Sequence, residues 1–209
     1  AHVTSLLIIG ATGAVGSRTL TAALADERVD RVFALGRRTL PEHPKLDARV
    51  VDFDTLDTVP PVDAVVCALG TTRRDAETRE AYRRIDHDIV VRVAELAREA
   101  GATTCALVSS LGANPASRTF YLRLKGEVEE SVRRVGFESV TIVRPSGLVG
   151  GERTRKNGLG DRLVEASAVI GPLVPARYRP VHVDRVAAVL LDAVLSPEDG
   201  IRIRESETL

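Results

Sequence analysis

Short apolar runs alternate with longer amphipathic stretches along the chain. Runs of apolar residues predict six strands, at residues 6–9, 32–35, 48–51, 64–68, 106–108 and 140–143. Most of these runs are apolar at consecutive positions, which is typical of strands buried on both faces of a parallel sheet. Helical spacing is found at about residues 14–27, 75–100, 119–135 and 182–196. The alternation predicts an α/β fold with a Rossmann-type, doubly wound parallel sheet.

The first predicted strand leads into a glycine-rich turn. Its residues are Gly10, Ala11, Thr12, Gly13, Ala14, Val15 and Gly16, and a helical stretch follows. In such a turn the first glycine allows a tight bend, the second lets a pyrophosphate approach the backbone, and the third lets helix and strand pack closely. Free amides and the positive end of the helix dipole would then face the phosphates. The turn predicts dinucleotide binding, with a purely structural turn as the alternative.

The end of the second predicted strand bears on the choice of cofactor. Arg37 and Arg38 follow the strand there, and no carboxylate does. An NAD site usually places a carboxylate at this point for the ribose hydroxyls, whereas a 2′-phosphate calls for arginine. We therefore expect NADP (NADPH) rather than NAD, unless both arginines are merely exposed loop charges. Asp52 and Phe53, after the third strand, are placed to meet the adenine.

A tyrosine and a lysine lie one helical turn apart. Tyr121 and Lys125 are spaced i and i+4, which stacks them on one helix face. A free phenol, with a pKa of about 10, is a poor acid or base at neutral pH, and a nearby cation favours the phenolate. The fifth strand ends at Ser109 and Ser110, where a hydroxyl could bond a substrate carbonyl. Ser110 is the better candidate and Ser109 the alternative, because a one-residue shift turns the side chain to the other face.

These motifs resemble the short-chain dehydrogenase/reductase superfamily in its extended and atypical form, over nearly the whole chain. The glycine turn is similar to the phosphate turn of that superfamily, Tyr121 with Lys125 to its Tyr-x-x-x-Lys pair, and Ser110 to its serine. The segments 143–147 and 181–187 are similar to the segment that borders the nicotinamide and to one that opens a late helix. The strings at 69–73, 109–114 and 120–127 resemble the Tat-interactive-protein oxidoreductase-like branch.

The resemblance implies an oxidoreductase acting on a small carbonyl or alcohol with Tyr121 as general acid/base. It implies that Lys125 lowers the pKa of the tyrosine and holds the nicotinamide ribose, while Ser110 orients the substrate oxygen and the cofactor delivers hydride. Further cofactor contacts are implied for Leu69, Gly70, Thr71, Pro145 and Ser146.

The chain departs from the superfamily at one position. Where many members carry an asparagine in the long helix after the fourth strand, it has Asp86 and His87. A relay through an asparagine amide is therefore in doubt. Either residue could substitute through water, but we expect both on the helix surface.

Composition narrows the classes of partner. Lys+Arg and Asp+Glu are balanced at 29 each, which argues against nucleic-acid binding. No apolar run approaches the roughly 20 residues of a membrane span. Cys67 and Cys105 lie in apolar runs and are expected as buried small hydrophobes, and no spacing suggests a metal site. Free cysteines and the lack of a signal-peptide pattern predict a cytoplasmic protein.

We expect one domain over residues 1–209, with a nucleotide-binding core at 1–147 and a small substrate-side extension at 148–209. The extension leaves space for a small-molecule substrate, and a protein partner or a homo-oligomer is possible. Residues 150–161 form either a solvated loop or a lid. The alternative function is an NADPH-binding regulatory or scaffold protein with little or no turnover. A sugar-nucleotide epimerase or dehydratase would need a larger substrate domain.

Overall fold

A seven-stranded parallel sheet forms the centre of the protein. The structure is a computed structural model that describes residues 4–70, 78–151 and 175–209. The strand order is β3-β2-β1-β4-β5-β6-β9, and every pairing is parallel. The strands are β1 (Thr4–Ile9), β2 (Val29–Gly36), β3 (Leu46–Val50), β4 (Ala64–Cys67), β5 (Thr104–Val108), β6 (Ser139–Arg144) and β9 (Gly200–Glu205). The predicted doubly wound α/β fold is confirmed.

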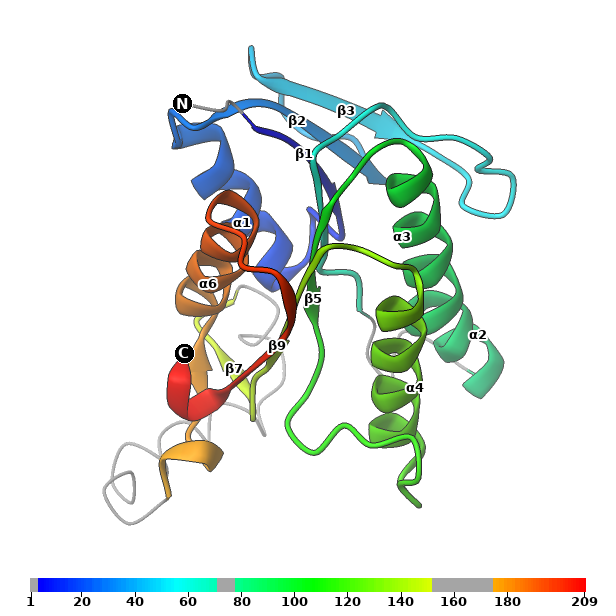
Figure 1. The fold of residues 1–209 in the computed structure, drawn as a ribbon, viewed down its shortest axis with the longest axis vertical. Coiled ribbons are helices and arrows are strands. Elements are labelled where there is room, and N and C mark those ends of the chain that lie inside the picture. Colours follow the sequence, from blue (N-terminus) through cyan, green and yellow to red (C-terminus); the bar gives the residue numbers. More distant parts are fainter. Residues whose placement is uncertain (1–3, 71–77, 152–174) are drawn as a thin grey trace.

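Helices cover both faces of this sheet (Figure 1). One layer consists of α1 (Ala14–Ala25) and α6 (Val183–Leu195). The other consists of α2 (Arg79–Arg83), the π-helical turn η1 (Arg84–Asp88), α3 (Ile89–Glu99) and α4 (Phe120–Arg134). A second, two-stranded sheet pairs β7 (Leu148–Val149) with β8 (Val181–His182), and the short 3-10 turns are η4 (Ala176–Tyr178) and η5 (Ser206–Thr208).

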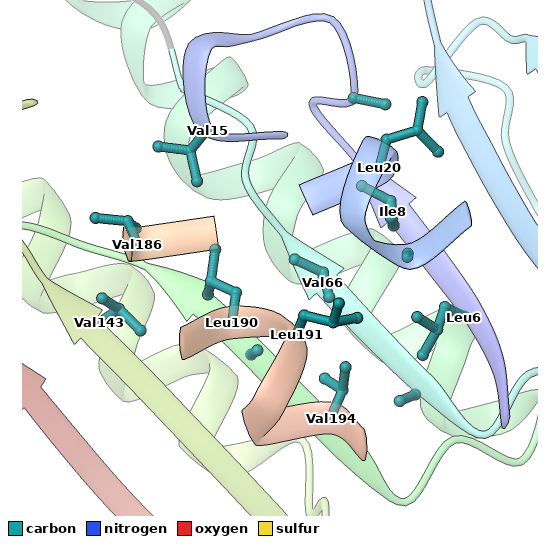
Figure 2. Close-up of a cluster of buried hydrophobic side chains, with 14 of the residues drawn as sticks. Leu6, Ile8, Val15, Leu20, Val66, Val143, Val186, Leu190, Leu191 and Val194 are labelled. Atoms are coloured by element: carbon teal, nitrogen blue, oxygen red, sulfur yellow. The ribbon is translucent and has the colours of Figure 1, made fainter. Parts of the chain in front are cut away.

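The period-2 alternation of the central strands divides their side chains between two hydrophobic cores. Leu6 and Ile8 of β1 point towards α1 and α6, where they meet Leu190, as Figure 2 shows. Leu7 and Ile9 point to the core under α3 and α4. Every residue of β4 is buried because the strand has a neighbour on each side and a helix layer on each face. Burying one such side chain contributes about 1.5–3 kcal/mol, so the sheet is a rigid support for the loops at its edge.

The structure differs from the sequence prediction at the periphery. Strand β9 was not predicted, because its two isoleucines alternate with arginines and stay exposed on the outermost strand. It pairs with β6, so part of the segment 148–209 belongs to the main sheet. The long helix predicted at 75–100 is divided by the π-helical turn, and residues 71–77 lie outside the described part.

The order of the strands fixes where a ligand can bind. Strand β2 lies on one side of β1 and β4 on the other, so the chain reverses its direction of winding between β1 and β4. In open α/β sheets the crevice at such a reversal, beyond the carboxyl ends of the strands, is the place for ligands.

Candidate active site

Two adjoining cavities lie at this reversal point. The arginine-side cavity, of about 120 Å³, is lined by the glycine turn, by Arg37 and Arg38, and by Phe53. The tyrosine-side cavity, of about 370 Å³, is lined by residues that include Ser110, Tyr121 and Lys125. Both are bordered by the same four residues, Gly13, Ala68, Leu69 and Gly70. The two cavities therefore form one elongated cleft across the carboxyl ends of β1, β2, β4 and β5.

The glycine turn is shaped by contacts that exclude a side chain. Gly10 has φ 83°, and a Cβ there would lie 2.4 Å from the carbonyl oxygen of Ala68. A Cβ on Gly16 would lie 2.1 Å from the carbonyl oxygen of Gly10. The two glycines thus allow the bend after β1 and the close packing of α1 against it, as the sequence pattern predicts.

The first turn of α1 offers free backbone donors to the cleft. The first helical bond runs from the Ser17 amide to Gly13 O at 3.0 Å, so the amides of Ala14, Val15 and Gly16 come before it. No side chain of the described residues caps this helix, and its first turn holds no carboxylate. Positive helix-dipole potential and unused amides fit an anionic group such as a pyrophosphate.

Arg38 reaches across from the end of β2 to this turn. Its Nη2 donates to Thr12 Oγ1 and, at 3.4 Å, to Thr12 O. A guanidinium has five N–H donors, so donors remain for a ligand. Arg37 is exposed and lines the same cavity. A second cluster of positive charge therefore lies beside the glycine turn.

Lys125 forms an ion pair with the carboxylate of Asp86, near the position where many members of the resembled superfamily carry an asparagine. Its Nζ lies 2.8 Å from Asp86 Oδ1 in a pair of which both side chains are buried. The Nζ also lies 5.9 Å from the centroid of the Tyr121 ring. Burial by itself would lower the pKa of Lys125, but attraction to Asp86, Tyr121 and Glu129 outweighs burial and raises it. The ammonium thus stays charged beside the phenol.

The expected surface position of Asp86 is therefore wrong. The residue is 1% exposed and lines the tyrosine-side cavity. It precedes the buried Val90 by four residues and the buried Val93 by seven, so it lies on the inner face of the helix. From the sequence, a charged residue at this position is expected on the surface. The sequence does not show that Lys125, which lies on a different helix, is its partner. His87 is partly buried and contacts Ser131 Oγ through Nε2 at 3.1 Å.

The two serines after β5 have different surroundings. Ser109 Oγ donates to Glu129 Oε1 at 2.5 Å, so its hydroxyl is engaged inside the protein. Ser110 Oγ makes one long contact, 3.5 Å to Leu111 O, among the described residues. Both serines line the tyrosine-side cavity, and this difference favours Ser110 as the one available to a ligand.

Pro145 and Ser146 form the far wall of the tyrosine-side cavity. Ser146 N donates to Ser206 Oγ at 2.6 Å, and its hydroxyl donates to Arg179 O at 2.6 Å. Gly147, Leu148 and Val183, not among the predicted site residues, complete this wall. Nothing in the sequence distinguishes these apolar residues from those of the hydrophobic core, so the sequence does not predict that they line a site.

Two of the described candidate residues, Asp52 and Gly16, do not line the cleft. Asp52 is exposed and binds the Asp54 amide at 3.0 Å, whereas its neighbour Phe53 does line the arginine-side cavity. Gly16 acts through packing. Thr71 lies outside the described residues, as does most of the predicted loop at 150–161.

Other candidate chemistry is absent from the described part of the chain. Cys67 and Cys105 are fully buried, and their mutual hydrogen bond together with burial raises the pKa of the Cys105 thiol. His182 Nδ1 accepts from the Asp184 amide and caps α6. Over residues 4–70, 78–151 and 175–209, no cluster of three His, Cys, Asp or Glu side chains could hold a metal. None of the helices described there is long and apolar enough to cross a membrane.

Comparison with known proteins gives two kinds of match. The NAD(P)H-binding family model matches residues 10–197. The mitochondrial protein FMP52 of Kluyveromyces lactis is 37% identical over 193 residues, covering 88% of this chain and 86% of that protein. Mitochondrial FMP52 of Eremothecium gossypii is 33% identical over 211 residues, covering 96% of this chain and 93% of that protein.

Solved structures with the same fold are more distant in sequence. MoeE5 bound to UDP-glucose and NAD has a TM-score of 0.71 at 21% identity, covering 95% of this chain and 74% of MoeE5. A short-chain dehydrogenase family protein from Francisella tularensis has a TM-score of 0.69 at 14% identity, with 96% of each chain covered. These structures share the fold that the resemblance implies, and the family model supports its NAD(P)H-binding part.

The comparison corrects the predicted location. The expectation of a cytoplasmic protein is wrong, because the curated fungal relatives are named as mitochondrial. Buried free thiols are compatible with more than one compartment and could not have selected the cytoplasm.

Proposed function

Because this chain belongs to the NAD(P)H-binding family, we propose that it is an NADPH-dependent oxidoreductase that acts on a small carbonyl or alcohol. The observation that carries the proposal is the single cleft in which the glycine turn and two arginines lie at one end and Ser110, Tyr121 and Lys125 at the other. A fold built for an extended dinucleotide requires this separation of a phosphate end from a reacting end.

The arginine-side cavity supports a 2′-phosphorylated cofactor. The amides of α1 and the bend at Gly10 fit the pyrophosphate, and Arg37 and Arg38 fit a phosphate on the adenosine ribose. Phe53 and Leu40 supply an apolar wall for the adenine. Leu69, Gly70, Pro145 and Ser146 would line the path towards the nicotinamide. The bound cofactor supplies the hydride for reduction, or accepts it in oxidation.

The tyrosine-side cavity supports acid/base chemistry on an oxygen. The Tyr121 hydroxyl would exchange a proton with the substrate oxygen, and Ser110 would hold that oxygen by a hydrogen bond. Lys125 stays charged and can bind the ribose hydroxyls next to the tyrosine.

The wall formed by Val108, Leu148 and Val183 favours a small, largely apolar substrate. This chain covers 74% of MoeE5, which binds UDP-glucose, and a small substrate fits the shorter chain better than a sugar nucleotide does.

The proposed 2′-phosphate site predicts a cofactor preference. Arg38→Ala should weaken NADPH binding by about 10- to 100-fold, because a hydrogen bond to a charged group contributes about 1.5–3 kcal/mol. NADH binding should hardly change, and Arg31→Ala, at the other end of β2, is the matched control. Fluorescence titration of both cofactors measures the effect. Tighter binding of NADH than of NADPH by the unaltered protein would contradict the assignment.

The acid/base role predicts a separation of binding from turnover. Tyr121→Phe should reduce turnover by a factor of about 100 or more, since general acid/base groups contribute 10²–10⁴-fold, while NADPH affinity stays nearly the same. Tyr178→Phe, an exposed tyrosine outside the cavity, is the control. The assay follows NADPH absorbance with a panel of small aldehydes, ketones and quinones. Persistent silence across the panel with intact NADPH binding would instead favour a regulatory or scaffold protein.

A further inference from the structure

The buried ion pair between Asp86 and Lys125 has a consequence for Tyr121. The pair lies in the wall of the tyrosine-side cavity, which Tyr121 also lines. Tyr121 and Lys125 come from α4, whereas Asp86 comes from the π-helical turn η1. Two elements that are remote in sequence thus bring a phenol, an ammonium and a carboxylate together.

Several other groups that can carry charge lie around Tyr121 in the described part of the chain, among them Arg79 and Arg123, whose guanidinium groups lie over the ring of the neighbouring Phe120. Tyr82 of α2 is buried and packs edge-on against the Tyr121 ring at a centroid distance of 6.3 Å. Glu129 of α4 binds Arg144 of β6 at 2.6 Å and Arg133 at 3.2 Å, so positive charge already balances it. Lys125, which is paired with Asp86, places its ammonium 5.9 Å from the centroid of the Tyr121 ring.

The net charge of the pair determines how strongly the phenol ionises. An isolated ammonium beside a phenol favours the phenolate, the form that takes a proton from an alcohol. A carboxylate 2.8 Å from that ammonium has the opposite charge and therefore opposes the field of the ammonium at the phenol. Beside a pair with little net charge, a phenol with its ordinary pKa of about 10 is protonated at neutral pH and can donate that proton.

We propose that Asp86 is a positioning residue that holds the Lys125 ammonium and, by offsetting its charge, keeps Tyr121 protonated for carbonyl reduction. The inference rests on the proposed function and adds that carbonyl reduction is the favoured direction of the reaction. In that reaction the carbonyl carbon gains the hydride that NADPH supplies, and the carbonyl oxygen takes the proton of the Tyr121 hydroxyl. The products are the alcohol and NADP⁺, and the tyrosinate regains its proton from solvent.

The ionisation of Tyr121 can be measured without any substrate. The chain has three tyrosines and no tryptophan, so the tyrosinate absorbance band is free of indole absorbance. Subtracting the titration of Tyr121→Phe isolates the signal of Tyr121 in the cofactor-free protein.

Asp86→Asn keeps the size of the side chain and removes its charge. We expect Tyr121 to ionise about one pH unit lower in this variant, because Lys125 is no longer offset. Lys125→Met should shift the ionisation in the opposite direction, and Asp86→Glu should restore the original curve. Asp88→Asn alters an exposed aspartate of the same turn and should leave the titration unchanged. A merely structural role for Asp86 would not produce these opposite shifts.

Two outcomes would overturn the inference. One is a Tyr121 titration that is the same in Asp86→Asn as in the unaltered protein, and the other is a shift of that variant to higher pH. If Asp86→Asn does not fold, Asp86→Glu and Lys125→Met decide, since the inference requires the first to match the unaltered protein and the second to ionise at higher pH. Failure of NADPH binding or of turnover would remove the proposed function and leave the titration result standing, so the two failures are distinguishable.

Discussion

Of the three glycines in the glycine turn, Gly16 leaves the least space for a Cβ, so its replacement tests the packing of the turn. Gly16→Ala would place a methyl group 2.1 Å from the carbonyl oxygen of Gly10. The methyl group and the oxygen can separate only if α1 shifts relative to the turn. We expect a loss of about 1–3 kcal/mol in the free energy of unfolding, as for overpacked cores, and weaker NADPH binding. Denaturant unfolding and cofactor titration measure the two effects.

Gly36 provides the matched control for stability. A Cβ at this position would meet no atom within 4 Å, so Gly36→Ala should change the free energy of unfolding by less than about 0.5 kcal/mol. Equal destabilisation by the two substitutions would show that the effect comes from glycine itself and not from the contact with Gly10.

The position of a single residue was predictable from the sequence where a local motif determines its backbone conformation. It was less predictable where a partner distant in sequence determines the position of its side chain. The bend at Gly10 and the packing of Gly16 follow from spacing alone. The buried position of Asp86 does not, since it depends on Lys125, which is 39 positions away (125 − 86) and on another helix. A buried carboxylate is stable only with such a partner, and sequence periodicity carries no record of pairing between helices.

Glu129 connects several elements around the site. Its carboxylate binds Ser109 after β5 and receives two bonds from Arg144 of β6, at 2.8 and 2.6 Å. Arg144 in turn lies 3.6 Å from Glu205 of β9. One buried charge on α4 thereby ties together three neighbouring strands.

Removing this charge should destabilise the protein. Glu129→Gln leaves Arg144 mostly buried, with Glu205 as its remaining charged partner among the described residues. We expect a loss of about 3 kcal/mol, at the low end for breaking a buried pair. Glu130→Gln is the control, because its pair with Arg134 is exposed and should contribute less than about 0.5 kcal/mol. Chemical denaturation distinguishes the two, and a similar loss in both variants would refute the role of Glu129.

The elements of the central sheet were predictable because they are buried on both faces. Consecutive apolar residues in β4, β5 and β6 reflect that burial directly. Strand β9 was missed because an edge strand needs no such run, and Ile201 and Ile203 remain 53% and 42% exposed. The π-helical turn was missed as well, because its residues Arg84–Asp88 include no proline or glycine that would mark an interruption of the helix.

For the molecule as a whole, Asp26 and Lys125 each contribute to how stability depends on pH. Hydrogen bonds from the side chain and the backbone of Arg28 lower the pKa of Asp26 from 3.8 to about 2. A lowered pKa in the folded state adds stability that is fully present above pH 3.8 and is lost as the pH falls through about 2. Lys125 has a raised pKa, so its contribution is complete below its ordinary value of 10.5 and is lost only above it.

The two effects predict that the free energy of unfolding is constant near neutral pH and changes at acid and alkaline pH. Each change can be assigned to one residue by substitution. The difference in unfolding free energy between the unaltered protein and Asp26→Asn should be constant at neutral pH and vanish as the pH falls from 3.8 towards about 2. In contrast, the difference from Lys125→Met should be present at neutral pH and shrink on the alkaline side of 10.5. Asp30→Asn, an exposed aspartate of β2, should follow the unaltered curve throughout. Urea unfolding at a series of pH values gives all three curves. A difference for Asp26→Asn that grew as the pH fell would reverse the required sign and rule out the bond to Arg28 as the cause.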